Sequence, residues 1–147
     1  MVVPSDVVSK LVTQHQDNSP RGIYIVICLL INLDKQIQGD IELILNMCIP
    51  KLQLIECHSN GDCVKLIENK LPDITLVDSN DVESDISNLI KKIKKIHNHP
   101  IIVLSKKKQR NNSISNMGQV IFINKPVNNM ELMSGVSTLL KEHMKKN

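Results

Sequence analysis

The chain has 147 residues, 41% of them hydrophobic, enough for one globular domain with a sizeable core. That core must be aliphatic, because the only aromatic residues are Tyr24 and Phe122. The longest apolar run, Ile23 to Ile31, is too short to span a bilayer, which takes about 20 apolar residues, and no secretory signal is expected.

The net charge of +3 is unevenly distributed. Up to Asp78, six Lys and Arg face ten Asp and Glu, a net −4, and from Ser79 onward twelve face five, a net +7. The basic residues lie either on solvated helix faces and loop ends or on a surface that meets an acidic partner. A nucleic-acid partner is disfavoured, because no aromatic residues are interleaved for base stacking.

The four cysteines, Cys28, Cys48, Cys57 and Cys63, form no CxxC motif and no metal-type pairing with histidine. We therefore expect reduced, mostly buried thiols in a cytoplasmic protein.

Residues 1–22 are expected to be a flexible leader and linker, and residues 23–147 the domain. Apolar, β-branched runs predict strands at 23–31, 52–57, 74–78, 101–105 and 119–124. Helical spacing of apolar residues predicts helices over 35–49, from 59 to before Pro72, around 86–96 and around 133–144. A short or irregular helix is expected between 106 and 118. This alternation predicts a doubly wound α/β fold, a five-stranded parallel sheet with helices on both faces.

Polar residues end several of these strands. They are Asn32, Asp34, Asp78, Ser105 and Lys125. In such a sheet the functional site lies beyond the carboxyl ends of the strands. A carboxylate, a hydroxyl and an ammonium at this edge are typical of a phosphoryl acceptor, in which the carboxylate attacks and the other two bind the phosphoryl oxygens.

Three segments, "SNGDCVKLIENKLPDITLVD", "HPIIVLS" and "FINKP", resemble the receiver domains of response regulators, the CheY-like superfamily. The likeness runs from about Ile23 to about Lys145. It implies a flavodoxin-like sheet with strand order 2-1-3-4-5, Asp78 as phosphoryl acceptor, Ser105 as switch hydroxyl and Lys125 as phosphate-pairing lysine. It also implies a cis bond between Lys125 and Pro126.

The family's switch aromatic lies on the fifth strand, near Phe122; Tyr24 does not match it.

The sequence departs from the family at the end of the first strand, where receivers carry two acids that help to hold Mg²⁺. Asn32 and Leu33 align with these positions, and Asp34 lies one place beyond. Leucine offers no oxygen ligand, and only a one-residue slip or bulge would bring Asp34 into the site. The loop after Asp78 also lacks the family's Met-Pro and Gly. The resemblance therefore implies at most a weak Mg²⁺ site made by Asp34 and Asp78, with Asn32 as a further donor.

The leading hypothesis is an atypical or pseudo-receiver of a two-component or phosphorelay system, acting in the cytoplasm through protein–protein contacts of its basic C-terminal half. The alternative is a functional receiver phosphorylated on Asp78, whose only enzymatic activity is self-phosphorylation and dephosphorylation there. Partners would be a histidine kinase, a phosphotransfer protein, another signalling protein or a second copy. A flavodoxin-like protein that binds flavin or nucleotide is a further alternative, disfavoured because no Gly-rich loop follows the first strand.

The histidines His58, His97, His99 and His143 end strands or helices in this scheme. We expect them to be capping or surface residues rather than phosphotransfer donors.

Overall fold

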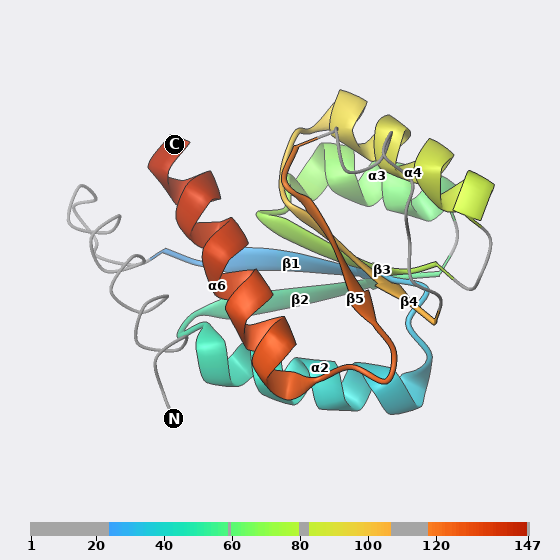
Figure 1. Ribbon diagram of the computed structural model, residues 1–147. Helices are drawn as coiled ribbons and strands as arrows, with labels where there is room; N and C mark the ends of the chain where they lie inside the picture. The colour runs from blue at the N-terminus through green and yellow to red at the C-terminus, as the bar shows by residue number, and fades with distance from the viewer. Residues whose placement is uncertain (1–23, 59, 80–82, 107–117, 147) are drawn as a thin grey trace.

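The computed structural model describes residues 24–58, 60–79, 83–106 and 118–146. They form a single parallel sheet with strand order β2-β1-β3-β4-β5 (Figure 1). The strands are β1 (Val26–Ile31), β2 (Leu52–Cys57), β3 (Ile74–Asp78), β4 (Ile101–Ser105) and β5 (Val120–Asn124), and the helices are α2 (Lys35–Cys48), α3 (Asn60–Lys70), α4 (Glu83–Ile96) and α6 (Asn129–Lys146). The predicted doubly wound α/β fold and its strand order are confirmed. The expected leader and most of the expected irregular helix lie outside the described residues.

The ends of the helices follow from the local sequence. The carboxylate of Asp34 accepts hydrogen bonds from the backbone N–H groups of Gln36 and Ile37, so Asp34 is the N-cap of α2. The helix ends at Cys48, two residues before Pro50, and α3 ends at Lys70, two residues before Pro72. Proline cannot continue a helix, because it lacks the N–H donor and its ring clashes with the preceding turn.

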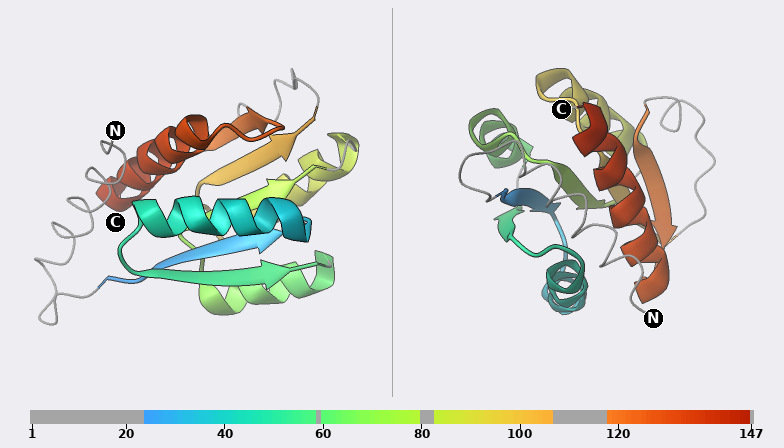
Figure 2. Two further views of the ribbon diagram at one scale, coloured as in Figure 1. Left: turned by 90° about the horizontal axis from the view of Figure 1, so that it is seen from below. Right: turned by 90° about the vertical axis from the view of Figure 1, so that its left-hand side faces the viewer.

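The sheet separates two aliphatic cores (Figures 1 and 2). Helices α2 and α6 lie side by side on one face, and α3 and α4 cover the other. Helix α6 approaches the sheet closely at Gly135, where an added Cβ would lie 2.7 Å from Cδ1 of Ile121. Among the described residues, no helix is long and apolar enough to cross a membrane.

The expectation for the histidines is wrong for two of the four. His99 is fully buried, with Nδ1 2.7 Å from the carbonyl oxygen of His97 and Nε2 2.6 Å from the Thr75 hydroxyl. Since a carbonyl only accepts, Nδ1 donates, and in the neutral ring Nε2 accepts from Thr75. Burial lowers the pKa of His99 to about 3. His143 is also buried, 3.4 Å from a carboxylate oxygen of Asp73.

Asp73 joins β1 to α6 at the amino end of the sheet. Its carboxylate accepts hydrogen bonds from the Tyr24 hydroxyl and from the Ile27 N–H, besides its pair with His143. Burial alone would raise the pKa of Asp73, but the hydrogen bonds from these three groups outweigh it and lower the pKa. This end of the sheet therefore carries a partly buried polar network.

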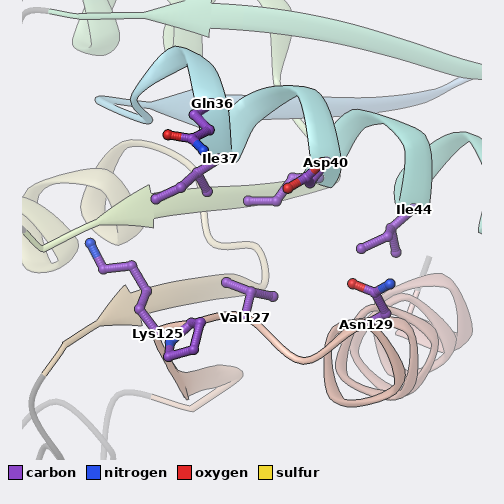
Figure 3. Close-up of a pocket in the computed structure, with 9 residues that line it drawn as sticks. Gln36, Ile37, Asp40, Ile44, Lys125, Val127 and Asn129 are labelled. Atoms are coloured by element: carbon purple, nitrogen blue, oxygen red, sulfur yellow. The ribbon is translucent and has the colours of Figure 1, made fainter.

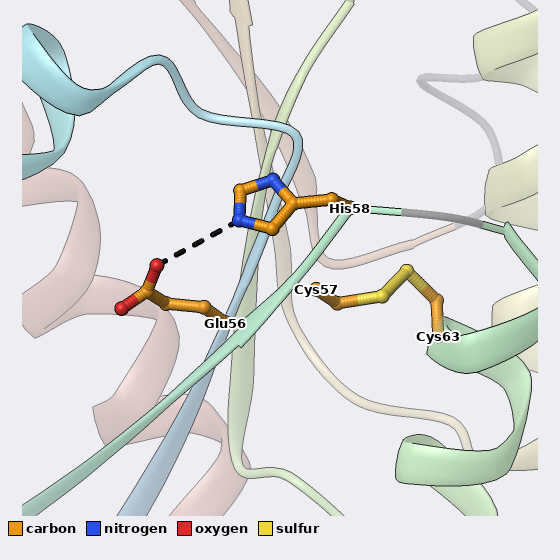
Figure 4. Close-up of a disulfide and its surroundings, with 4 residues drawn as sticks. All are labelled: Glu56, Cys57, His58 and Cys63. Carbon is orange, nitrogen blue, oxygen red and sulfur yellow. Dashed lines mark ion pairs between the residues drawn. A yellow bond between two sulfur atoms is a disulfide. The ribbon is translucent and has the colours of Figure 1, made fainter.

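The expectation for the cysteines is wrong for one pair. Cys57, the last residue of β2, and Cys63, in the first turn of α3, form a disulfide with a Cα–Cα distance of 5.7 Å (Figure 4). The two cysteines are six residues apart in sequence, and both lie in the same core. Their Cα–Cα distance is within the range that a disulfide bridges. Cys28 and Cys48 are free and buried, as expected.

Candidate functional site

The candidate site lies at the carboxyl edge of β3, β4 and β5. Asp78 is the last residue of β3 and Ser105 the last of β4, while Lys125 directly follows β5. The Lys125 N–H donates to the Ser105 carbonyl at 2.8 Å, so strand pairing continues one residue beyond β5. The parallel sheet thus brings these three residues together from segments far apart in the chain.

The Lys125 ammonium is bound to both carboxylate oxygens of Asp78. Nζ lies 2.8 Å from Oδ1 and 2.7 Å from Oδ2. The side chains are only 10% and 3% exposed, so the two charges neutralise each other away from solvent. An ammonium in this position would also pair with a phosphoryl group carried by Asp78.

Two serines lie next to this pair along the backbone. Ser79 directly follows Asp78 in sequence, and Ser105 ends β4, the strand between β3 and β5. Ser105 is fully buried at the end of β4. The N–H of Ser79, directly after Asp78, donates to the Leu104 carbonyl at 3.0 Å. The Ser79 hydroxyl is buried and finds no hydrogen-bond partner among the described residues. Sequence reasoning did not single out Ser79, because a serine after a strand is common.

The peptide bond between Lys125 and Pro126 is cis, as the resemblance implied. Phe122 lies on β5, half-buried against the core formed with α3 and α4.

In the turn after β1, Asn32 and Leu33, the two residues aligned with the family's acids, and Asp34, the next residue, take up different positions. Asn32 adopts a left-handed conformation with φ of 59°, and its N–H donates to the Cys57 carbonyl at 2.9 Å. Leu33 is buried in the core under α2 and α6. Asp34 follows as the exposed N-cap of α2.

These residues do not fit a dedicated Mg²⁺ site. Mg²⁺ requires hard oxygen ligands in near-octahedral geometry. Leu33 supplies no oxygen, Oδ1 of Asp34 already caps α2, and both Asp78 oxygens are bound by Lys125. Within the described part of the chain, no three His, Cys, Asp or Glu side chains gather as a metal site requires. The one-residue slip that would bring in Asp34 finds no support, because Leu33 lies in the core and Asp34 at the cap.

A pocket of about 250 Å³ adjoins the site between α2 and the segment from β5 to α6 (Figure 3). Its apolar wall is formed by Ile37, Ile41, Ile44, Pro126 and Val127, and Gln36, Asp40, Lys125 and Asn129 add polar groups. Lys125 thus contributes to the pocket while its Nζ pairs with Asp78. The sequence gives no sign of this pocket, because Ile37, Ile41 and Ile44 have the spacing of ordinary core residues.

No family model matches the sequence, and no curated protein matches it. Solved structures do match the fold. The signal receiver domain of a protein described as a Luxo repressor from Vibrio parahaemolyticus is 15% identical, with a TM-score of 0.68 over 84% of this chain and 95% of that one. The receiver domain of a modulated diguanylate cyclase from Desulfovibrio desulfuricans G20 is 14% identical, with a TM-score of 0.65 over 84% and 100%.

A response regulator from Desulfuromonas acetoxidans is 21% identical, with a TM-score of 0.62 over 81% of this chain and 98% of that one. The chain therefore has the fold of response-regulator receiver domains.

Proposed function

We propose that this chain is an atypical receiver-fold signalling module that acts in the cytoplasm through protein–protein contacts. The observation that carries the proposal is the buried pair of Lys125 and Asp78 beside a turn in which Leu33 replaces an acid. Without a metal, the ammonium is the group that neutralises the acceptor carboxylate. A phosphoryl group would have to displace it from at least one oxygen.

The surface proposed for partner contacts is the basic C-terminal half. Exposed Lys91, Lys92 and Lys95 on α4 supply positive charge for an acidic partner. Lys94 differs from them, because its Nζ donates to the Gly118 carbonyl at 2.6 Å and so ties α4 to the segment before β5. A signalling protein or a second copy of the chain would contact this side.

The second candidate is a receiver phosphorylated on Asp78 by a histidine kinase or a phosphotransfer protein. The convergence of Asp78, Lys125 and Ser105 at one edge favours it. In this role the Asp78 carboxylate attacks phosphorus, Lys125 pairs with the phosphoryl oxygens, and Ser105 is the hydroxyl that senses them. Mg²⁺ would bind only weakly, through Asp34 and Asp78 with Asn32. A flavin- or nucleotide-binding role remains a hypothesis, and the visible absorbance of the purified protein would test for bound flavin.

The experiment that separates the two candidates is a titration of ¹⁵N-labelled protein with beryllofluoride and Mg²⁺, which together mimic an acyl phosphate. The pseudo-receiver predicts no saturable shift of the amides of Asp78, Ser105 and Lys125. Saturable shifts that vanish in Asp78→Asn would instead establish the phosphorylated receiver. Leu139 and Leu140, in the second half of α6, provide reference amides.

A further inference from the structure

The disulfide between Cys57 and Cys63 lies at the carboxyl end of β2, at the same edge of the sheet as the candidate site but separated from β3 by β1. Both cysteines belong to the core formed by α3 and α4 with the sheet, as do Ile31 and Val77. These two residues immediately precede Asn32 and Asp78. The redox state of the cysteine pair therefore bears on the core that supports the turn after β1 and the end of β3.

The backbone connects the disulfide to the turn itself. Cys57 is the register partner of Ile31, the last residue of β1. The Cys57 carbonyl accepts the N–H of Asn32, the residue with the left-handed backbone. A displacement of Cys57 is thus transmitted to Asn32 through one hydrogen bond.

Reduction changes the space that the two sulfurs need. Bonded sulfurs lie about 2 Å apart, whereas non-bonded heavy atoms pack at roughly 3.5–4 Å. Cys57 and Cys63 are 3% and 0% exposed, and a close-packed core has no spare room for this expansion. We expect the first turn of α3 or the end of β2 to move.

The position of Cys63 favours thiol–disulfide exchange. It lies in the first turn of α3, where the positive end of the helix opposes the effect of burial, which disfavours a thiolate. The preceding residues, Gly61 and Asp62, are exposed, and Gly61 weakens the first turn of α3. On the other side, exposed Glu56 and His58 flank Cys57 and point away from the disulfide (Figure 4). Opening the first turn of α3 would expose the sulfurs without unfolding the sheet.

We propose that Cys57 and Cys63 form a reversible thiol–disulfide couple that sets the conformation of the Asn32–Asp34 turn. The co-reactant is a low-molecular-weight disulfide such as glutathione disulfide. One cysteine thiolate attacks a glutathione sulfur and releases one glutathione thiolate, and the second cysteine thiolate then attacks the mixed disulfide and releases the other. The two cysteines lose two electrons and two protons, and one glutathione disulfide becomes two glutathiones. The consequence for signalling rests on the proposed function.

The test uses the full chain in glutathione buffers from fully reducing to strongly oxidising. After an acid quench and alkylation in denaturant, peptide masses report the state of each cysteine. We expect the Cys57–Cys63 disulfide to form and disappear within this range, while Cys28 and Cys48 stay thiols throughout. These two lie in the other core, across the sheet, and so serve as internal references. A pair that stays oxidised or stays reduced across the whole range would overturn the proposal.

The conformational part is read from amide resonances. Reduction is expected to shift the amides of Asn32, Leu33 and Asp34 and to leave those of Leu139 and Leu140 unchanged. In Cys63→Ala the redox response should be lost, and in the matched control Cys48→Ala it should persist. A disulfide that switches without moving the turn amides contradicts the proposal. These readouts do not depend on phosphorylation, so they judge this inference even if Asp78 accepts no phosphoryl group.

Discussion

Lys125 and Asp78 form a buried, two-oxygen ion pair, with Nζ 2.8 and 2.7 Å from the carboxylate oxygens. The pair joins the end of the central strand β3 to the residue after the edge strand β5. It fixes the Asp78 carboxylate and links β3 to the segment after β5 across the end of β4, so it contributes to the fold as well as to the candidate site.

Removing the ammonium should therefore destabilise the protein. Lys125→Met leaves the Asp78 carboxylate buried without its cation, and we expect the free energy of unfolding to fall by about 3–5 kcal/mol. Urea denaturation measures this change. Lys141→Met, which removes an exposed lysine from α6, is the matched control and should change stability little. When Lys125→Met is made in the Asp78→Asn background, the free energy of unfolding should fall much less. An equal fall in both backgrounds would show that the two residues are not coupled.

Asn32 and Leu33 align with the two acids of receiver domains. We expect the protein to respond differently to a carboxylate at each of these positions. Leu33→Asp places a charge in the core, and we expect a loss of about 3 kcal/mol or more in the free energy of unfolding. Asn32→Asp changes one atom in a partly exposed turn and should leave the fold stable while strengthening Mg²⁺ binding. Unfolding curves and NMR titrations with Mg²⁺ measure both effects. A stable Leu33→Asp protein that binds Mg²⁺ tightly would contradict the placement of Leu33.

Asp34 should act as a helix cap. Asp34→Ala removes the acceptor for two N–H groups of α2, at an expected loss of about 1 kcal/mol in the free energy of unfolding. Asp40→Ala removes the same charge from an exposed position of the same helix without touching the cap, and should change stability less. If Asp34→Ala left stability unchanged but altered the Mg²⁺ titration, Asp34 would be a metal ligand instead.

Stability should fall at mildly acidic pH because His99 is buried in its neutral form. Its pKa is about 3 in the folded chain, against about 6.5 when unfolded, so below pH 6.5 the unfolded state binds more protons. The stabilisation that depends on neutral His99 is fully present above pH 6.5 and decreases as the pH falls towards 3. Between pH 7.5 and 5 it amounts to about 2 kcal/mol.

Denaturation at a series of pH values tests this assignment. His99→Gln should flatten the pH dependence in this range, although it lowers stability at neutral pH by disturbing the bonds to Thr75 and His97. His58→Gln, at an exposed position, should keep the full slope. An unchanged slope in His99→Gln would place the responsible proton on another group.

The sequence predicted the strands well because each is rich in apolar residues and bounded by proline, glycine or polar residues. β3 and β4, for example, coincide with the predicted ranges 74–78 and 101–105. Parallel order then placed Asp78, Ser105 and Lys125 at one edge. The contact between Lys125 and Asp78 requires the lysine side chain to extend across the end of β4. No local sequence pattern predicts this conformation.

The predictions from sequence that were wrong concern polar and sulfur-containing residues. Their partners are distant in the chain or cannot be chosen from the sequence. His99 is buried only because Thr75, from the neighbouring strand, and the His97 carbonyl satisfy both ring nitrogens. Cys57 and Cys63 have a spacing that equally suits two separate thiols. Their pairing depends on the angle between β2 and α3, which no local pattern specifies.

The most direct test of the central claim is the intact mass of the protein after incubation with Mg²⁺ and a small phosphodonor such as acetyl phosphate. Because Lys125 binds both Asp78 oxygens and Leu33 offers no oxygen ligand, a pseudo-receiver should form no stable phosphoryl adduct in either the wild type or Asp78→Asn. A mass increase of one phosphoryl group in the wild type that is lost in Asp78→Asn would contradict it and establish a functional receiver.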